Sequence, residues 1–188
     1  MILTLVNKKG GCGKTSLACL LALYWAERGK KVAIQDLDPQ GSADAFVSNI
    51  DNENIVAYRP GRSYDHIITD TQGGIRPKEL KVMVEQVDLA LIPFLLSPTD
   101  MRATGDTVRL LGEEKKARLV FNKVNPATTI FRDRSNYANI LGVRAIKSHL
   151  GDRVSYKHAL VDGWGALNAK SKEELTLLVK EIEKNGQK

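Results

Sequence analysis

Short runs of apolar residues alternate along the chain with longer stretches whose apolar positions recur at helical spacing. The apolar runs are Ile2–Val6, Val32–Ile34, His66–Thr69, Leu89–Ile92 and Arg118–Phe121. Runs this short, separated by helical stretches, are typical of parallel strands that are buried on both faces. The pattern therefore predicts a doubly wound α/β domain with a mostly parallel sheet, which binds its ligand at the carboxyl ends of the strands.

The stretches between these runs carry the expected helices. They are Lys14–Arg28, Gly41–Ser48, Pro77–Gln86, Pro98–Leu111, Ser135–Leu141 and Lys172–Lys184. Residues 49–63 are rich in asparagine, proline and glycine, and we expect them to be a surface connection. The chain has 188 residues and shows no repeat or linker. We therefore expect one domain over residues 1–188.

A glycine-rich segment joins the first strand to the first helix. A strand, a glycine-rich turn and a helix start in this order are what a phosphate-binding loop requires. The loop residues are expected to bind nucleotide, and they are Lys9, Gly10, Gly11, Cys12, Gly13, Lys14, Thr15 and Ser16. Its three glycines are expected to take positive φ and to turn backbone N–H groups toward the anion. The dipole of the following helix favours the same anion.

Three side chains that open the helix have distinct expected contacts. Lys14 is placed to contact the β- and γ-phosphates, the Thr15 hydroxyl to hold Mg²⁺, and Ser16 to reach the α-phosphate. Cys12 and Cys19 have no metal-ligand spacing and suggest no disulfide framework. A reducing cytoplasm is the simplest setting for these thiols.

Carboxylates follow the second and third apolar runs. Asp36 and Asp38 lie in the string Gln35-Asp36-Leu37-Asp38-Pro39-Gln40-Gly41, and Asp70 follows His66–Thr69. Two carboxylates two residues apart in an extended segment point the same way and repel each other unless a cation or donor lies between them. An Asp-rich turn that caps a helix is the alternative interpretation. Asp70 stands where a carboxylate would bind Mg²⁺ directly or through water.

The charge is unevenly distributed along the chain. The net charge is +6, with −2 over residues 1–114 and +8 over residues 115–188. Such asymmetry favours a polyanionic partner for the C-terminal third, although lysines that serve only solubility are an alternative. The longest uninterrupted apolar run, Leu17–Ala26, is too short to span a bilayer, and no signal peptide is expected.

The phosphate loop departs from the common G-x-x-x-x-G-K-[ST] pattern, because Lys8 holds the first glycine position and Lys9 precedes the glycines. In this it resembles the deviant Walker A loop of the ParA/MinD family of dimeric P-loop ATPases. The D-x-D-P-Q-G string resembles the second signature of that family. Ser97–Met101 and Gly151–Lys157 are similar to later segments of the small ParF-like partition ATPases, which lack an N-terminal helix-turn-helix domain.

The resemblance implies a mechanism and a set of partners. It implies that ATP and Mg²⁺ close a homodimer in which Lys9 reaches the nucleotide of the other subunit, as an arginine finger does. Asp38 is then expected to orient the attacking water, Asp36 to lie near the metal, and Asn122 to contact adenine or to act as a turn former. A ParB/ParG-like centromere-binding protein is expected to stimulate slow ATP hydrolysis and to release the dimer from non-specific DNA. The expected location is cytoplasmic and nucleoid-associated.

Other residues carry weaker expectations. The string Asn122-Lys123-Val124-Asn125 is similar to the N-K-x-D motif of GTPases, but Asn125 lacks the charge that guanine favours, so ATP is expected. Gln72 either helps to position water or is an ordinary loop residue. The candidate DNA contacts are Arg153 first, then Lys157, Lys147, Arg144, Arg132 and Arg134.

Three alternative functions share the same nucleotide core. A MinD-like membrane-associated switch would need a basic amphipathic C-terminal helix, whereas the last expected helix mixes glutamates with lysines. A metabolic ATP-dependent enzyme on this core stays open. An iron–sulfur carrier would need further bridging cysteines and is excluded.

Overall fold

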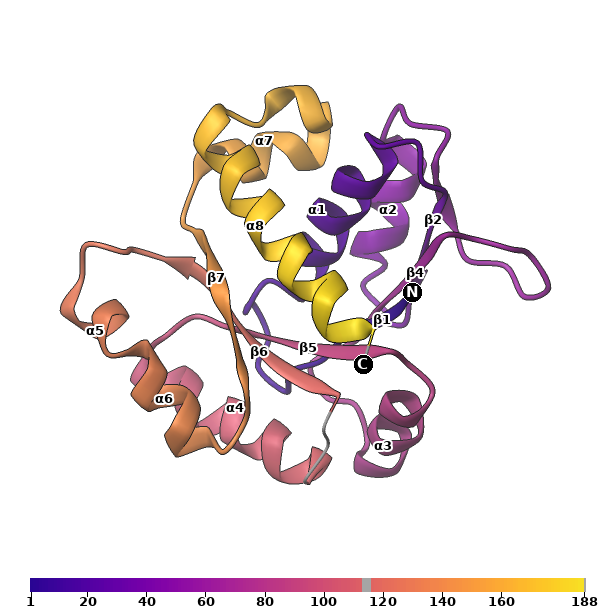
Figure 1. The fold of residues 1–188 in the computed structure, drawn as a ribbon. Helices are drawn as coiled ribbons and strands as arrows, with labels where there is room; N and C mark the ends of the chain where they lie inside the picture. Colours follow the sequence, from indigo (N-terminus) through magenta and orange to yellow (C-terminus); the bar gives the residue numbers. More distant parts are fainter. Residues whose placement is uncertain (113–115, 188) are drawn as a thin grey trace.

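The computed structural model describes residues 1–112 and 116–187 as seven parallel strands between two layers of helices (Figure 1). The strand order in the sheet is β3-β2-β4-β1-β5-β6-β7. The strands are β1 Ile2–Leu5, β2 Val32–Asp36, β3 Ile55–Ala57, β4 His66–Asp70, β5 Leu89–Phe94, β6 Ala117–Val124 and β7 Ala145–Gly151. The doubly wound α/β class expected from the sequence is confirmed.

Helices cover both faces of the sheet. One face is packed against α1 Lys14–Ala26, α2 Ser42–Asn49, α7 Val154–Asp162 and α8 Ala169–Gly186. The other is packed against α3 Pro77–Glu85, α4 Pro98–Leu111 and α6 Arg134–Leu141. Two short helical segments, α5 Thr129–Arg132 and η1 Trp164–Ala166, lie in the connections. No helix in residues 1–112 or 116–187 is long and apolar enough to cross a membrane.

The alternation of side chains in the central strands divides the interior into two cores. In β5, Leu89 and Leu91 face the core beneath α1 and α8, whereas Ala90, Ile92 and Phe94 face the core beneath α4. Successive residues of a strand point to opposite faces, so a strand between two helical layers must be apolar at nearly every position. This explains why the central strands were visible as unbroken apolar runs.

The two outermost strands were not predicted. Residues 49–63 were expected to be a surface connection, but Ile55–Ala57 within them form the edge strand β3. This expectation was wrong because the strand has only three residues and lies within a stretch whose asparagine, proline and glycine residues favour a loop. The other edge strand, β7, holds Lys147 and Ser148 in its middle, so it shows no unbroken apolar run. The helix α7 was also missed.

The edge strand β7 is irregular where its polar residues lie. Its pairing with β6 shifts register between Leu119 and Phe121, which is the signature of a bulge. The carboxylate of Glu181 on α8 accepts hydrogen bonds from the backbone N–H groups of Lys147 and Ser148, both at 2.9 Å. Glu181 therefore satisfies two donors that the bulge withdraws from the ladder.

The strand order places the candidate site at the middle of the sheet. β1 lies between β4 and β5, and the chain builds one half of the sheet (β2, β3, β4) before the other (β5, β6, β7). The connection after β1 therefore lies at the topological switch point, where open α/β sheets bind ligands. This connection is the glycine-rich loop.

Candidate nucleotide-binding site

Two glycines give the loop between β1 and α1 its shape. Gly11 has a φ of 76° and Gly13 a φ of 92°, both in the left-handed region that a side chain disfavours. The expectation of positive φ is confirmed at these two positions. It was wrong at Gly10, which is not among the glycines with positive φ. The loop ends in α1, whose N-cap is Gly13.

A second constraint acts on Gly13 from the end of β6. A Cβ at Gly13 would lie 2.4 Å from Nδ2 of Asn122, which donates a hydrogen bond of 2.9 Å to the carbonyl oxygen of Cys12. Asn122 is buried, and its hydrogen bond to Cys12 fixes the loop against the end of β6. Burial raises the pKa of the Cys12 thiol, so this cysteine fills space in the loop and is not an activated thiol.

Thr15 and Asp70 meet at the carboxyl end of β4. The Thr15 hydroxyl donates to Oδ2 of Asp70 at 2.5 Å, and Oδ1 of Asp70 is buried without a hydrogen-bond partner among the described residues. Burial, helped by the charges of Asp36 and Asp38, raises the pKa of Asp70 to about 6. A buried carboxylate with an unsatisfied oxygen beside a hydroxyl is a fitting place for a hard cation.

The donor set suits Mg²⁺ held jointly with phosphates. No group of three or more His, Cys, Asp or Glu side chains within residues 1–112 and 116–187 could hold a metal ion without other ligands. Mg²⁺ typically keeps several waters and uses one or two carboxylates together with substrate phosphates. Thr15 and Asp70 provide protein ligands of this kind.

Asp36 and Asp38 have different surroundings although they are two residues apart. Oδ2 of Asp36 accepts from the backbone N–H groups of Ala43 and Asp44 at 2.8 and 3.0 Å, and its Oδ1 accepts from that of Asp38 at 2.9 Å. Asp36 therefore caps α2, which is the alternative interpretation given above. Asp38 is half-buried, and among the described residues its carboxylate accepts a single hydrogen bond, from the Gln40 N–H to Oδ1 at 3.0 Å. Of the two, Asp38 keeps more of its carboxylate available.

The two loop lysines also differ. Lys14 is buried, and its Nζ donates to the carbonyl oxygen of Lys9 at 3.3 Å. The Lys9 side chain is 40% exposed, and its Nζ lies 3.9 Å from Oδ1 of Asp100, a residue in the first turn of α4 that is 4% exposed. Lys9 thus points out of its own loop toward α4.

A polar network that sequence reasoning missed fixes the start of the loop. The buried Asn7 side chain donates to the Pro93 carbonyl at 2.8 Å and to Thr104 at 3.1 Å, and accepts from the Lys9 N–H at 3.0 Å. Thr107 accepts from the Lys8 N–H at 3.0 Å. The sequence signal for this network was the spacing of Asp100, Thr104 and Thr107, which places three polar residues on one side of α4. The same spacing is typical of a solvent-facing stripe, so it does not by itself indicate a buried network.

Gly73, in the connection after β4, lies against the glycine-rich loop. A Cβ at Gly73 would lie 3.0 Å from the Lys8 carbonyl oxygen and 3.5 Å from the Gly10 nitrogen, whereas one at Gly74 would meet nothing within 4 Å. Gly73 is therefore needed because the loop backbone approaches it closely. Gln72 is half-buried between Thr71 and Gly73.

We expect Gly73→Ala to raise the Kd for ADP by about tenfold, because the added methyl group pushes on the loop backbone. Gly74→Ala is the matched control and is expected to leave the Kd within about twofold. Titration calorimetry measures both values, and thermal melting checks that each variant is folded. Equal losses in the two variants would contradict this account.

A small cavity lies on the side of α1 away from Asp70. It is lined by residues at the start of α1, at the ends of β6 and β7 and on α7, including Ser16, Asn122, Lys123, Asp152 and Lys157. Thr15 and Asp70, the candidate metal ligands, thus lie on the β4 side of the loop, whereas this cavity lies on the β6 and β7 side. Asn122 lines the cavity, as a residue that contacts the base would, but its Nδ2 is committed to Cys12.

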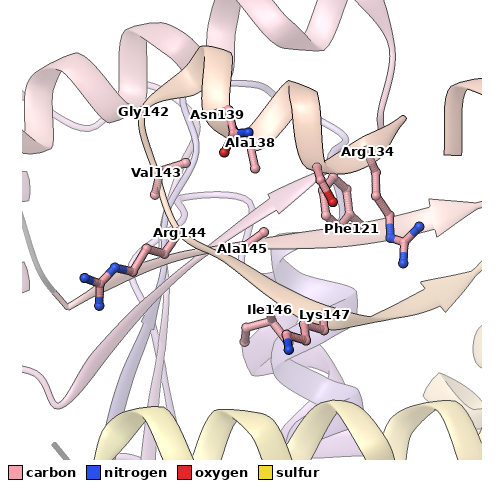
Figure 2. Close-up of a pocket in the computed structure, with 11 residues that line it drawn as sticks. Phe121, Arg134, Ala138, Asn139, Gly142, Val143, Arg144, Ala145, Ile146 and Lys147 are labelled. Atoms are coloured by element: carbon pink, nitrogen blue, oxygen red, sulfur yellow. The ribbon is translucent and has the colours of Figure 1, made fainter. Parts of the chain in front are cut away.

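Several candidate DNA contacts lie together along β7. A groove of about 630 Å³ is lined by Arg134 on α6 and by Arg144 and Lys147 on and beside β7, with no acidic side chain among the described lining residues (Figure 2). An adjoining groove shares Arg134 and Lys147 and adds Arg153 and Lys170, but Glu173, Glu174 and Glu181 line it too. The first groove therefore carries the more concentrated positive charge.

Arg153, the first choice from the sequence, is engaged in an ion pair. Its Nε and one terminal nitrogen donate to the carboxylate of Glu174 at 2.9 and 2.6 Å, and Glu174 also accepts from the Gly151 N–H and the Tyr156 hydroxyl, both at 3.1 Å. The pair ties α7 to α8. Lys157 and Arg132 are exposed but do not line the two basic grooves.

Comparison with known proteins places these features in context. The model of the family described as "CobQ/CobB/MinD/ParA nucleotide binding domain" matches residues 3–163. The chain is 26% identical over 208 residues to the maintenance of carboxysome distribution protein A of Halothiobacillus neapolitanus, covering 96% of this chain and 95% of that protein.

Two solved structures share the fold. The MinC:MinD cell division complex of Aquifex aeolicus gives a TM-score of 0.77 at 14% identity, covering 97% of this chain and 96% of the other. The plasmid partition protein of Borrelia burgdorferi bound to AMPPNP gives a TM-score of 0.72 at 16% identity, covering 97% and 98%. The three chains therefore share one fold.

Proposed function

This chain belongs to the CobQ/CobB/MinD/ParA family of nucleotide-binding domains, and on that premise we propose that it is a ParA-type partition ATPase. The single observation that carries the proposal is the second loop lysine. The Lys9 side chain is 40% exposed and turned toward α4, while the loop already has a buried lysine, Lys14, for its own nucleotide. A spare cation at the open end of a phosphate site is suited to the nucleotide of another subunit.

The residues of one chain divide the work of hydrolysis. The backbone N–H groups after Gly11 and Gly13 cradle the phosphates, and Lys14 balances their charge. Thr15 and Asp70 would hold Mg²⁺, which when bound neutralises charge that develops on the transferred phosphoryl group. Asp38 accepts a hydrogen bond from the attacking water and orients it. Asp36 is a positioning residue, since its carboxylate fixes both the N–H of Asp38 and the start of α2.

Pairing of two chains follows from the position of Lys9. In the single chain its Nζ lies near Asp100, whose Oδ1 has no hydrogen-bond partner among the described residues. When a second triphosphate approaches face to face, Lys9 exchanges this carboxylate for the phosphates of its neighbour. ATP occupancy thereby favours the homodimer, and ADP, which lacks the γ-phosphate, favours separation.

The groove along β7 is the proposed DNA surface. Phosphate contacts by Arg134, Arg144 and Lys147 would bind DNA without reading its sequence. Arg132 and Lys157 stay candidates for outer contacts. For Arg153 we propose a structural role in place of the leading role in DNA contact, because its guanidinium already satisfies Glu174.

We expect the double variant Arg144→Ala/Lys147→Ala to weaken ATP-dependent DNA binding and to reduce the log-log salt slope by about 2, because each lost phosphate contact removes about 0.9. The double variant Lys78→Ala/Lys81→Ala on the exposed surface of α3 removes the same charge and is the control. Fluorescence anisotropy of a labelled duplex at several salt concentrations measures both slopes. Equal slopes for the two double variants would remove the β7 groove as the DNA surface.

A partner protein completes the proposed cycle. The relative from Halothiobacillus is named for carboxysome distribution and the Borrelia structure for plasmid partition, which supports a role in positioning a cargo. We propose that a ParB/ParG-like protein bound to the cargo stimulates slow ATP hydrolysis and releases the dimer from nucleoid DNA. Hydrolysis that rises with DNA and this partner together is the direct test.

The arrangement of α8 argues against a membrane-bound switch of the MinD kind. The apolar face of this helix is formed by Leu175, Leu178, Val179 and Ile182, and all four are fully buried in the core. An amphipathic helix that binds a bilayer must instead offer its apolar face to lipid. Pelleting with anionic liposomes separates the two functions, because the partition ATPase is expected to stay in the supernatant.

A further inference from the structure

A groove stays open beside α3 on one face of the sheet. On the opposite face, α1 and α2 both pack against β2, whereas α3 packs against α4 and leaves part of its own face of the sheet uncovered. The resulting groove has a volume of about 580 Å³ and lies between α3 and the strands β1, β2 and β4. No residue of the glycine-rich loop lines it, so it is distinct from the nucleotide site.

The groove gathers apolar side chains that are exposed to solvent. Ile2, Leu37 and Val82 line it and are 37%, 42% and 53% exposed, and they are three of the seven large apolar side chains that are exposed among the described residues. The half-buried Ile67 and Met83 extend the same surface. Exposed apolar side chains that cluster in this way mark an interaction site, whereas isolated ones are ordinary.

The charged residues that line the groove are Lys78 and Glu79, and they have different surroundings. Oε1 of Glu79 lies 3.9 Å from a terminal nitrogen of Arg76. Lys78 is exposed and forms no ion pair within the described part of the chain. The groove therefore offers a cation without a partner beside an apolar surface.

The loop that follows the lining residue Tyr58 has the same balance of charge. Arg59 and Arg62 are exposed, and neither forms an ion pair with any residue that the structure describes. Asp65, where the loop ends, lies 3.5 Å from Nζ of Lys30. The basic side chains at the border of the groove are thus available while the acidic ones have partners, which favours an acidic ligand.

Leu37 connects the groove to the nucleotide site. It stands between Asp36 and Asp38, and Asp36 caps α2 on the opposite face of the sheet. The Leu37 N–H donates to the carbonyl oxygen of Asp70 at 2.9 Å. A ligand that packs on Leu37 therefore contacts the segment that holds the carboxylates of the hydrolytic site. Such shared structure allows binding in the groove and ATP hydrolysis to be coupled.

We propose that this groove docks an acidic amphipathic segment of the partner protein. The apolar side chains of the segment pack on Leu37 and Val82, and an acidic side chain pairs with Lys78. An open apolar groove beside a helix suits an amphipathic helix, which binds through side chains on one face. The inference rests on the proposed partition ATPase and places the contact through which its partner changes the rate of hydrolysis.

The binding test uses a labelled synthetic helix of leucine and glutamate, with the leucines along one face, and the same helix with lysine in place of glutamate. Fluorescence anisotropy is expected to show that the parent protein binds the glutamate helix about tenfold more tightly than the lysine helix. Val82→Glu is expected to raise the Kd for the glutamate helix by about tenfold, because it puts a charge into the apolar groove. Leu177→Glu, at an exposed apolar position of α8, is the matched control and is expected to stay within about twofold.

A second pair of variants tests the charge at the groove. Lys78→Glu is expected to reverse the preference, so that the lysine helix binds more tightly than the glutamate helix. Lys81→Glu makes the same change of charge at an exposed position of α3 outside the groove and is expected to keep the preference of the parent. Equal effects of these two variants would assign the preference to overall charge and overturn the proposal.

ATP hydrolysis tests the coupling. The glutamate helix at saturation is expected to speed hydrolysis by the parent about tenfold, and to leave Val82→Glu at its basal rate, which equals that of the parent. No binding of the glutamate helix to the parent, or unchanged hydrolysis when it is bound, would overturn the proposal. So would loss of ATP-dependent pairing in Val82→Glu, because the groove would then be a contact between two copies of the chain. Binding of the helix to a parent protein that hydrolyses no ATP would keep the docking groove and overturn the ATPase function.

Discussion

Lys9→Ala is expected to leave the protein monomeric in the presence of Mg²⁺ and a non-hydrolysable ATP analogue, under conditions in which the parent protein pairs. The reason is that Lys14 is buried beneath the loop while Lys9 alone of the two extends from it toward α4. Loss of a cation donated to another subunit also removes transition-state stabilisation, so hydrolysis is expected to fall about a thousandfold. Analytical ultracentrifugation and phosphate release measure the two effects.

Lys8→Ala provides the matched control for this experiment. Lys8 is the neighbouring exposed lysine, and its one hydrogen bond within the described part of the chain is donated by its backbone N–H to Thr107. We expect this variant to pair and hydrolyse ATP as the parent does. Pairing of Lys9→Ala on ATP and its separation on turnover, at the level of the parent, would refute the proposed mechanism.

Asp38→Ala is expected to bind ATP and to pair, but to hydrolyse ATP about a hundredfold more slowly, because the water loses the group that orients it. Asp38 is suited to this role because its carboxylate accepts a hydrogen bond from one backbone N–H group, whereas the carboxylate of Asp36 accepts from three. Single-turnover hydrolysis measured beside nucleotide affinity separates the chemical step from binding.

Two comparisons sharpen the Asp38 experiment. Asp38→Asn keeps an oxygen that accepts from the Gln40 N–H, so slow hydrolysis in this variant as well assigns the effect to the lost charge and not to the turn. Asp44→Ala changes an exposed carboxylate in the first turn of α2 and is expected to hydrolyse at the parent rate. Full activity of Asp38→Ala would assign water positioning to another group.

The central architecture could be predicted from the sequence because burial on both faces leaves an apolar signature. Strands such as β5 sit between two helical layers and contain no polar position, whereas the edge strand β3 has only three residues and the edge strand β7 has polar residues in its middle. The loop and its lysines were equally visible, since few structures other than a phosphate site need glycines followed by Gly13-Lys14-Thr15.

Other parts of the site depend on contacts between distant segments and were not predictable. The charge of Arg153 is evident in the sequence, but its neutralisation by Glu174 depends on α7 packing against α8. Thr104 and Thr107 have the spacing of a surface stripe, yet both are buried because the Asn7 side chain and the Lys8 N–H supply their partners. The need for glycine at position 73 likewise depends on the Lys8 backbone, which is distant in sequence and close in space.

The irregular rim of the sheet bears on how copies of this protein can assemble. At one end β3 has three residues, and at the other Glu181 occupies the donors of β7 that a neighbouring chain would need. Neither edge strand therefore offers free backbone groups with which a strand of another chain could pair. Higher-order assembly, where it occurs, must therefore use contacts between side-chain surfaces and not a continuous backbone ladder. Nucleotide turnover can break side-chain contacts, whereas it could not break such a ladder.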